Sequence, residues 1–212
     1  MEDMTELKVE NLYVQQGEFW LENVNLQLEQ GQTGALVGKS ASGRTTLLSA
    51  IAGAIRPSSG RILYQGKEMY EDEKEIRKRM SVVYAQPNFN TELTIRRLEK
   101  EISKFEPWFD HEAFASYKKK LELNDHTRIK LYPEDLQRKL LLALALGRRP
   151  SFLLMDEVTN NADESSQKQM WELIREYQKQ HLLTILYTSY REEEILQAQQ
   201  IWLLDNGTCR EV

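Results

Sequence analysis

TGALVGKSASGRTTLLSAIAG, residues 33–53, contains a short apolar run, a loop of small residues and a second apolar segment. The run at 35–37 predicts a buried strand, and residues 38–44 are rich in Gly and Ser. From Thr45 the apolar residues return with helical spacing, and Gly53 predicts where that helix ends. Strand, small-residue loop and helix follow in the order that a phosphate-binding unit requires.

The loop GKSASGRT at 38–45 has the spacing G-x-x-x-x-G-[basic]-[ST]. In such a loop, backbone N–H groups and the N-terminus of the following helix hold phosphate oxygens. The hydroxyl of Thr45 is expected to bind Mg²⁺. The alternative is an ordinary Gly/Ser turn, which the order of strand, loop and helix disfavours. The residues expected to contact a nucleotide are Gly38, Lys39, Ser40, Ala41, Ser42, Gly43, Arg44, Thr45 and Thr46.

Two residues of this loop depart from the motif. Arg44 stands where the motif has Lys, and a planar guanidinium is not equivalent to a compact ammonium group. Ala41 stands where many such loops have another Gly, and its methyl group opposes a positive φ angle or crowds a phosphate.

A second strand ends in two carboxylates. In FLLMDEVTNNAD at 152–163, the apolar run delivers Asp156 and then Glu157. Next to a phosphate loop, Asp156 suits coordination of Mg²⁺ through water, and Glu157 suits polarisation of an attacking water. The alternative is a strand that ends in a solvated acidic turn, which would be favoured if no phosphate loop preceded it.

Around these motifs, the pattern predicts an α/β fold with a mainly parallel sheet and an antiparallel N-terminal part. Apolar residues alternate with polar ones over 7–14 and 21–28. Residues 91–135 are charged and helical in pattern, with Pro107 between two helices and Asp110 as the N-cap of the second. The remaining predicted strands are 61–64, 81–85, 152–155, 182–187 and 200–204, and the remaining predicted helices are 136–147, 164–180 and 191–198.

The composition argues against a nucleic-acid-binding protein, a disulfide-bonded protein and a membrane-spanning protein. The 212 residues carry a net charge of -5, which gives no support to a nucleic-acid partner. The one cysteine, Cys209, excludes an internal disulfide framework and is interpreted as a passenger rather than a reactive thiol. The charged start predicts no signal peptide, and no apolar run approaches the roughly 18 residues of a membrane span. We therefore expect a soluble protein without direct membrane insertion.

The order and spacing of the motifs resemble the nucleotide-binding subunits of ABC transporters along nearly the whole chain, 1–212. IRPSSGRILYQGK resembles the segment after the Walker A helix, and VVYAQP resembles the Q-loop, with Gln86 at the glutamine. SFLLMDEVTNNAD resembles the Walker B strand and D-loop, with Asp163 matching in the latter, and IWLLDNG resembles the penultimate strand and its turn. LLLALALGRRPSFLLMDE is most similar to the branch that serves type-2 exporters of drugs, peptides and polysaccharides.

The resemblance implies a P-loop NTPase core, with residues 1–35 as a mainly antiparallel β part and 91–135 as an inserted helical subdomain. It implies ATP and Mg²⁺ as ligands. It also implies a metal site formed by Thr45, Gln86 and Asp156, and a catalytic set of Glu157, Gln86 and Ser189.

Several positions depart from the family pattern. The switch histidine falls on Ser189, and no histidine of this chain stands there. The family's LSGGQ signature falls on YPEDL at 132–136, begins at Leu131, or has lost its central residues. Each of these alignments lacks the Ser-Gly-Gly core. Each also brings the negative charges of Glu134 and Asp135 towards the phosphates of a nucleotide bound to the partner domain. The aromatic that stacks on adenine falls near Gln16, with Tyr13 or Phe19 as weak substitutes, and Val158 replaces a Pro. Reduced ATPase activity is therefore expected.

The interpretation that follows is a degenerate ATP-binding subunit that couples to transmembrane permease subunits at the inner face of the cell membrane. Because two nucleotide domains meet head to tail in this family, the departures favour a heterodimer with a better-preserved domain over a homodimer. The alternative is a regulatory pseudo-ATPase on the same fold. The aromatic residues Phe89, Phe105, Trp108 and Phe109 could line a groove for a permease helix, or form the core of the helical subdomain. An active enzyme on another substrate lacks any further nucleophile or metal cluster in the sequence.

Overall fold

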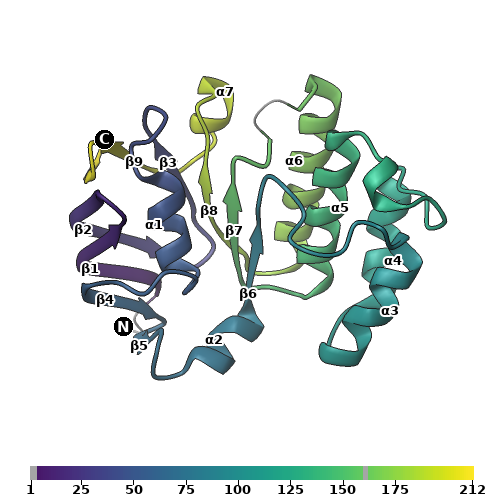
Figure 1. Ribbon diagram of the computed structural model, residues 1–212, viewed down its shortest axis with the longest axis horizontal. Coiled ribbons are helices and arrows are strands. Elements are labelled where there is room, and N and C mark those ends of the chain that lie inside the picture. Colours follow the sequence, from purple (N-terminus) through teal and green to yellow (C-terminus); the bar gives the residue numbers. More distant parts are fainter. Residues whose placement is uncertain (1–3, 160–161) are drawn as a thin grey trace.

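The computed structural model describes residues 4–159 and 162–212, so Met1–Asp3 and the Asn160-Asn161 pair of the predicted D-loop lie outside the described residues. Two sheets face each other across helix α1 (Arg44–Ile51), as Figure 1 shows. The first sheet is antiparallel, in the order β2-β1-β4-β5. Its strands are β1 (Thr5–Gln16), β2 (Phe19–Glu29), β4 (Ser59–Tyr64) and β5 (Lys67–Glu68).

The second sheet has the order β10-β9-β3-β8-β7-β6. All of its strands are parallel except β10, which pairs antiparallel with β9. The predicted α/β fold with a mainly parallel sheet is confirmed. The strands are β3 (Thr33–Val37), β6 (Met80–Val83), β7 (Phe152–Asp156), β8 (Thr184–Thr188), β9 (Gln200–Asp205) and β10 (Thr208–Glu211).

Both faces of the parallel sheet are buried, and successive residues of a strand enter different cores. On β7, Leu153 and Met155 join the core under helices α5 (Glu134–Gly147) and α6 (Glu164–Gln180). Leu154, between them, joins the core under α1 and the antiparallel sheet. Because side chains alternate across a strand, a strand covered on both faces reads as a continuous apolar run, as FLLM does.

Residues 91–135 contain α3 (Ile95–Phe105), α4 (His111–Lys120) and the short 3-10 helix η1 (Ile129–Leu131), at the right of Figure 1. The carboxylate of Asp110 accepts the backbone N–H of Ala113, so the predicted N-cap of α4 is confirmed. Phe109 is buried with its ring 5.3 Å from that of Phe114, and Phe89 is partly buried, whereas Phe105 and Trp108 are exposed.

Some elements differ from the sequence-based expectation. Helix α2 (Glu73–Arg79) and strand β10 were not predicted, and α7 (Glu192–Ile195) is much shorter than the expected helix 191–198. The antiparallel part does not stop at residue 35. Strand β3 hydrogen-bonds in the parallel sheet, while β4 and β5, later in the chain, complete the antiparallel sheet. In the described part of the chain, none of the helices combines the length and apolarity that a bilayer crossing requires.

Candidate nucleotide site

Three neighbouring strands end at one edge of the parallel sheet, at the top of Figure 1. The phosphate loop follows β3, Glu157 follows β7 and Ser189 follows β8. In open parallel sheets, ligands bind outside the carboxyl ends of the strands. The fold therefore brings together motifs that lie more than a hundred residues apart in the sequence.

The backbone of the loop requires small residues. A Cβ atom added to Gly38 would lie 2.3 Å from the carbonyl oxygen of Leu204, so only glycine fits there. Gly43 has φ 103°, and its Cα faces the ring of Phe19. Ala41 has φ 63°, in the left-handed region that opposes a Cβ atom. The loop accordingly takes the positive φ angle at position 41 in spite of the methyl group.

Thr45, in the first turn of α1, lies next to Asp156 at the end of β7. The hydroxyl of Thr45 lies 3.3 Å from Oδ1 of Asp156, which also accepts the hydroxyl of Thr188 at 2.9 Å. Asp156 is buried, and Thr188 fixes its rotamer from the neighbouring strand. Hydroxyl and carboxylate oxygens are ligands that Mg²⁺ prefers. Among the described residues, no group of three or more His, Cys, Asp or Glu lies together in a way that could hold a metal ion.

Arg44 lines the same cavity as the loop, and its side chain bonds to protein groups there. Its guanidinium is buried, with Nη2 donating to Oε1 of Glu157 at 2.9 Å and Nη1 donating to the carbonyl oxygen of Ser189 at 3.4 Å. Glu157 itself has φ 52°, and its backbone N–H donates to the hydroxyl of Thr188 at 2.8 Å. Arg44, which stands in the motif's Lys position, is thus the counter-ion of Glu157, the residue expected to act on water.

The hydroxyl of Ser189 also points inward. It donates to Oε2 of Glu194 at 2.7 Å, and Ser189 is fully buried. Glu194, on α7, is buried too and accepts two more donors: the hydroxyl of Thr159 at 2.8 Å and the indole Nε1–H of Trp171 at 3.3 Å.

Sequence reasoning missed Glu194 because it stands in the acidic run at 192–194, which is typical of a solvated helix face. No local pattern in the sequence separates this carboxylate from its two exposed neighbours.

A cavity of about 420 Å³ opens in front of the loop. At its far end, Gln16 accepts the hydroxyl of Thr46 at 2.9 Å and Phe19 contributes its ring. Tyr13 does not line it, so of the two possible aromatic substitutes only Phe19 is in place. The lining residues are Gln16, Phe19, Ser40, Ala41, Ser42, Gly43, Arg44, Thr45, Thr46 and Glu157.

Gln86 and the YPEDL segment lie apart from this cavity. Gln86 follows β6, is exposed and does not line the cavity, so this structure does not join it to Thr45 and Asp156. Helix α5 begins at Glu134, after Tyr132 and Pro133. The buried Arg138 pairs with Glu134 at 3.0 Å and with Asp135 at 3.4 Å, which offsets the negative charge that the sequence places there.

Asp163 caps helix α6. Its carboxylate accepts the backbone N–H of Ser166 at 2.8 Å, and this hydrogen bond is the main reason that its pKa falls to about 2. Burial raises the pKa of the Cys209 thiol to about 11, in agreement with an unreactive cysteine.

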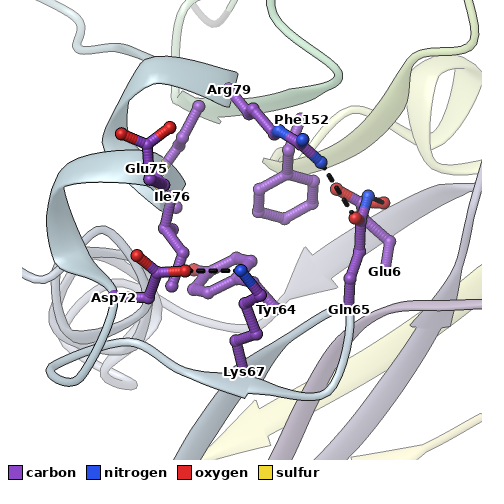
Figure 2. A pocket seen from close by; sticks show the side chains of 10 residues that line it. Glu6, Tyr64, Gln65, Lys67, Asp72, Glu75, Ile76, Arg79 and Phe152 are labelled. Atoms are coloured by element: carbon purple, nitrogen blue, oxygen red, sulfur yellow. Dashed lines mark hydrogen bonds and ion pairs between the residues drawn. The ribbon is translucent and has the colours of Figure 1, made fainter.

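A second, more enclosed pocket lies at the opposite edge of the sheet, between β4, β5 and α2 (Figure 2). Its polar groups already satisfy each other: Lys67 pairs with Asp72 at 2.6 Å, and Gln65 joins Glu6 to Arg79. Burial raises the pKa of Glu6, which lies against this network. No glycine loop in the described part of the chain lines this pocket, and the helix N-terminus beside it, that of α2, carries the acidic side chains Asp72 and Glu75. We therefore assign the site to the phosphate-loop edge.

The chain is similar in sequence to known proteins. Residues 21–160 match the family model described as ABC transporter. The chain is 27% identical to the energy-coupling factor transporter ATP-binding protein EcfA2 of Clostridium tetani, over 96% of the chain and 77% of that protein. It is 30% identical to the sulfate/thiosulfate import ATP-binding protein CysA of Synechocystis sp., over 96% of the chain but only 59% of that protein.

Among solved structures, a dimeric post-hydrolysis ATP-binding cassette bound to ADP and phosphate superposes with a TM-score of 0.83 at 21% identity, covering 97% of each chain. At that identity the likeness concerns the fold. It confirms the P-loop NTPase fold that the resemblance implies.

Proposed function

The chain belongs to the ABC transporter family, and from this premise we propose that it is an ATP-binding subunit that drives or regulates transmembrane permease subunits. The observation that carries the proposal is the meeting of a glycine loop, a Thr hydroxyl and a buried Asp carboxylate at the carboxyl edge of the sheet. The residue types fit a Mg-nucleotide: backbone N–H groups for phosphate and oxygen ligands for the metal.

In this proposal each residue has a role. The backbone of residues 38–43 and the N-terminus of α1 bind phosphate, Thr45 and Asp156 hold Mg²⁺, and Thr188 keeps the Asp156 carboxylate in place. Mg²⁺, when bound, would offset phosphate charge. Glu157 is the candidate for orienting a water.

ATP with Mg²⁺ should raise the melting temperature of the isolated protein. A ligand at about 100 times its dissociation constant stabilises the native state by about 2.7 kcal/mol, or about 5–10 °C for a chain of this length. Differential scanning fluorimetry with ATP, with and without Mg²⁺, measures the shift. Thr45→Ala should abolish its Mg²⁺-dependent part, while Thr208→Ala, at the exposed first residue of β10 and outside the cavity lining, should not. No shift at millimolar Mg-ATP would refute the proposal.

The alternative is a regulatory pseudo-ATPase that binds nucleotide and controls a partner protein. The Arg44–Glu157 ion pair is the observation that favours it, because the pair occupies the residue expected to act on water. Co-purification with a membrane subunit would distinguish a transport subunit from a regulatory module.

The motifs are the basis for a proposal about the second nucleotide domain with which this chain pairs. In a homodimer, both composite sites would contain Arg44, Ser189 and YPEDL, whereas pairing with a better-preserved domain leaves each site half intact. We therefore expect a heterodimer in the assembled transporter, held at the inner face of the membrane through permease subunits. Similarity to the type-2 exporter branch suggests export, although one relative is named as an import protein.

Alone, the Glu157→Gln variant should show the same mass with and without Mg-ATP in size-exclusion chromatography coupled to light scattering. The reason is that no chain in such a sample supplies a signature with small residues at its centre. A homodimer that appears only with ATP would contradict the heterodimer proposal and show that YPEDL serves as a signature.

A further inference from the structure

Arg44 and Glu157 satisfy each other inside the cavity that the phosphate loop lines. The Arg44 guanidinium is 8% exposed, and the Glu157 side chain is 38% exposed towards the cavity. The contact joins residues 113 positions apart, so local chain geometry does not impose it. A second guanidinium nitrogen holds the Ser189 carbonyl oxygen, which ties the same side chain to the end of β8.

We propose that Arg44 gates the site: without nucleotide it neutralises Glu157, and nucleotide phosphates must take the guanidinium away from that carboxylate. The inference rests on the proposed function and adds a regulation of the same site. Nη1 and Nη2 of Arg44 already donate to protein oxygens, so a phosphate group and Glu157 compete for the same guanidinium. Binding would then free Glu157, so the carboxylate becomes available only once a nucleotide is present.

The gate predicts an effect of Glu157→Gln on nucleotide affinity that depends on Arg44, whereas simple charge repulsion predicts an effect that does not. Glu157→Gln weakens the hold on Arg44, so the guanidinium is free to reach phosphate and nucleotide affinity rises. The same substitution also removes one negative charge near the phosphates, which alone raises affinity. These two causes separate in a double-mutant cycle, because only the gate requires Arg44.

The test is isothermal titration with a slowly hydrolysed ATP analogue and Mg²⁺, on the wild type, Glu157→Gln, Arg44→Met and the double variant. We expect Glu157→Gln to tighten binding about 10-fold when Arg44 is present, and less than about twofold when it is Met. Glu193→Gln is the matched control, since it removes the same charge from an exposed side chain and should leave affinity unchanged. An equal gain in both Arg44 backgrounds would overturn the gate and leave bulk charge as the cause.

A second cycle uses urea unfolding of the same four proteins without nucleotide. The gate requires coupling between Arg44 and Glu157 in this cycle, and additive effects of the two substitutions would contradict it. If none of the variants bound nucleotide, the proposed function would be wrong. The unfolding cycle would still show whether Arg44 and Glu157 interact. Arg44→Gln, which also removes the charge but keeps a polar side chain, replaces Arg44→Met if that variant does not fold.

Discussion

ATP turnover by the isolated protein should be at least about 100-fold slower than that of an intact family member assayed beside it. Losing one well-placed group that stabilises phosphate commonly costs about 100- to 1000-fold. Here Arg44 stands in the Lys position and is held by Glu157, and Ser189 stands in the histidine position with its hydroxyl donated to Glu194. Because losses of residues that act together are not additive, we expect no simple product of the two costs.

A coupled assay for released phosphate, with Glu157→Gln as the inactive control, measures this rate. Arg44→Lys alone should not restore full turnover, because Ser189 still faces Glu194 and the signature is unchanged. Turnover of about 1 per second or faster, removed by Glu157→Gln, would show that Arg44 and Ser189 suffice.

Glu194→Ala should lower the free energy of unfolding by about 3 kcal/mol. The substitution leaves the hydroxyls of Ser189 and Thr159 and the indole N–H of Trp171 without their acceptor in a buried place. A buried donor that loses its acceptor costs about 1–3 kcal/mol of folding free energy, whereas a substitution that removes the donor itself costs less. Urea denaturation, read by tryptophan fluorescence and by circular dichroism, measures the loss.

Two variants separate the network from a simple loss of packing. Ser189→Ala removes one donor and leaves Glu194 with Thr159 and Trp171, so it should cost only about 1 kcal/mol. Glu194→Gln keeps an acceptor oxygen and the side-chain volume, and should fall between the two. A stability of Glu194→Ala within about 0.5 kcal/mol of the wild type would show that the donors find other partners.

The elements of the fold were largely predictable from local pattern. Helix α6 has the predicted bounds, 164–180, because apolar residues recur at helical spacing behind the Asp163 cap. Strand β7 follows from an apolar run that is buried on both faces. Helix α2 and strand β10 escaped prediction because both are short and polar, and their pairing with neighbouring elements stabilises them more than their own sequences do.

Residue types at fixed spacing encode the phosphate loop, the Asp156–Glu157 pair and the resemblance that they carry, so all three can be identified from the sequence alone. It also identified Arg44 and Ser189 as departures. The contacts of those two side chains, in contrast, depend on how the chain folds in three dimensions. Arg44 meets Glu157 and Ser189 meets Glu194 because parallel strands from distant parts of the chain end at one edge of the sheet. A buried cation or hydroxyl requires a hydrogen-bonding partner, and tertiary packing determines which group lies close enough to serve. No local stretch of sequence specifies that group.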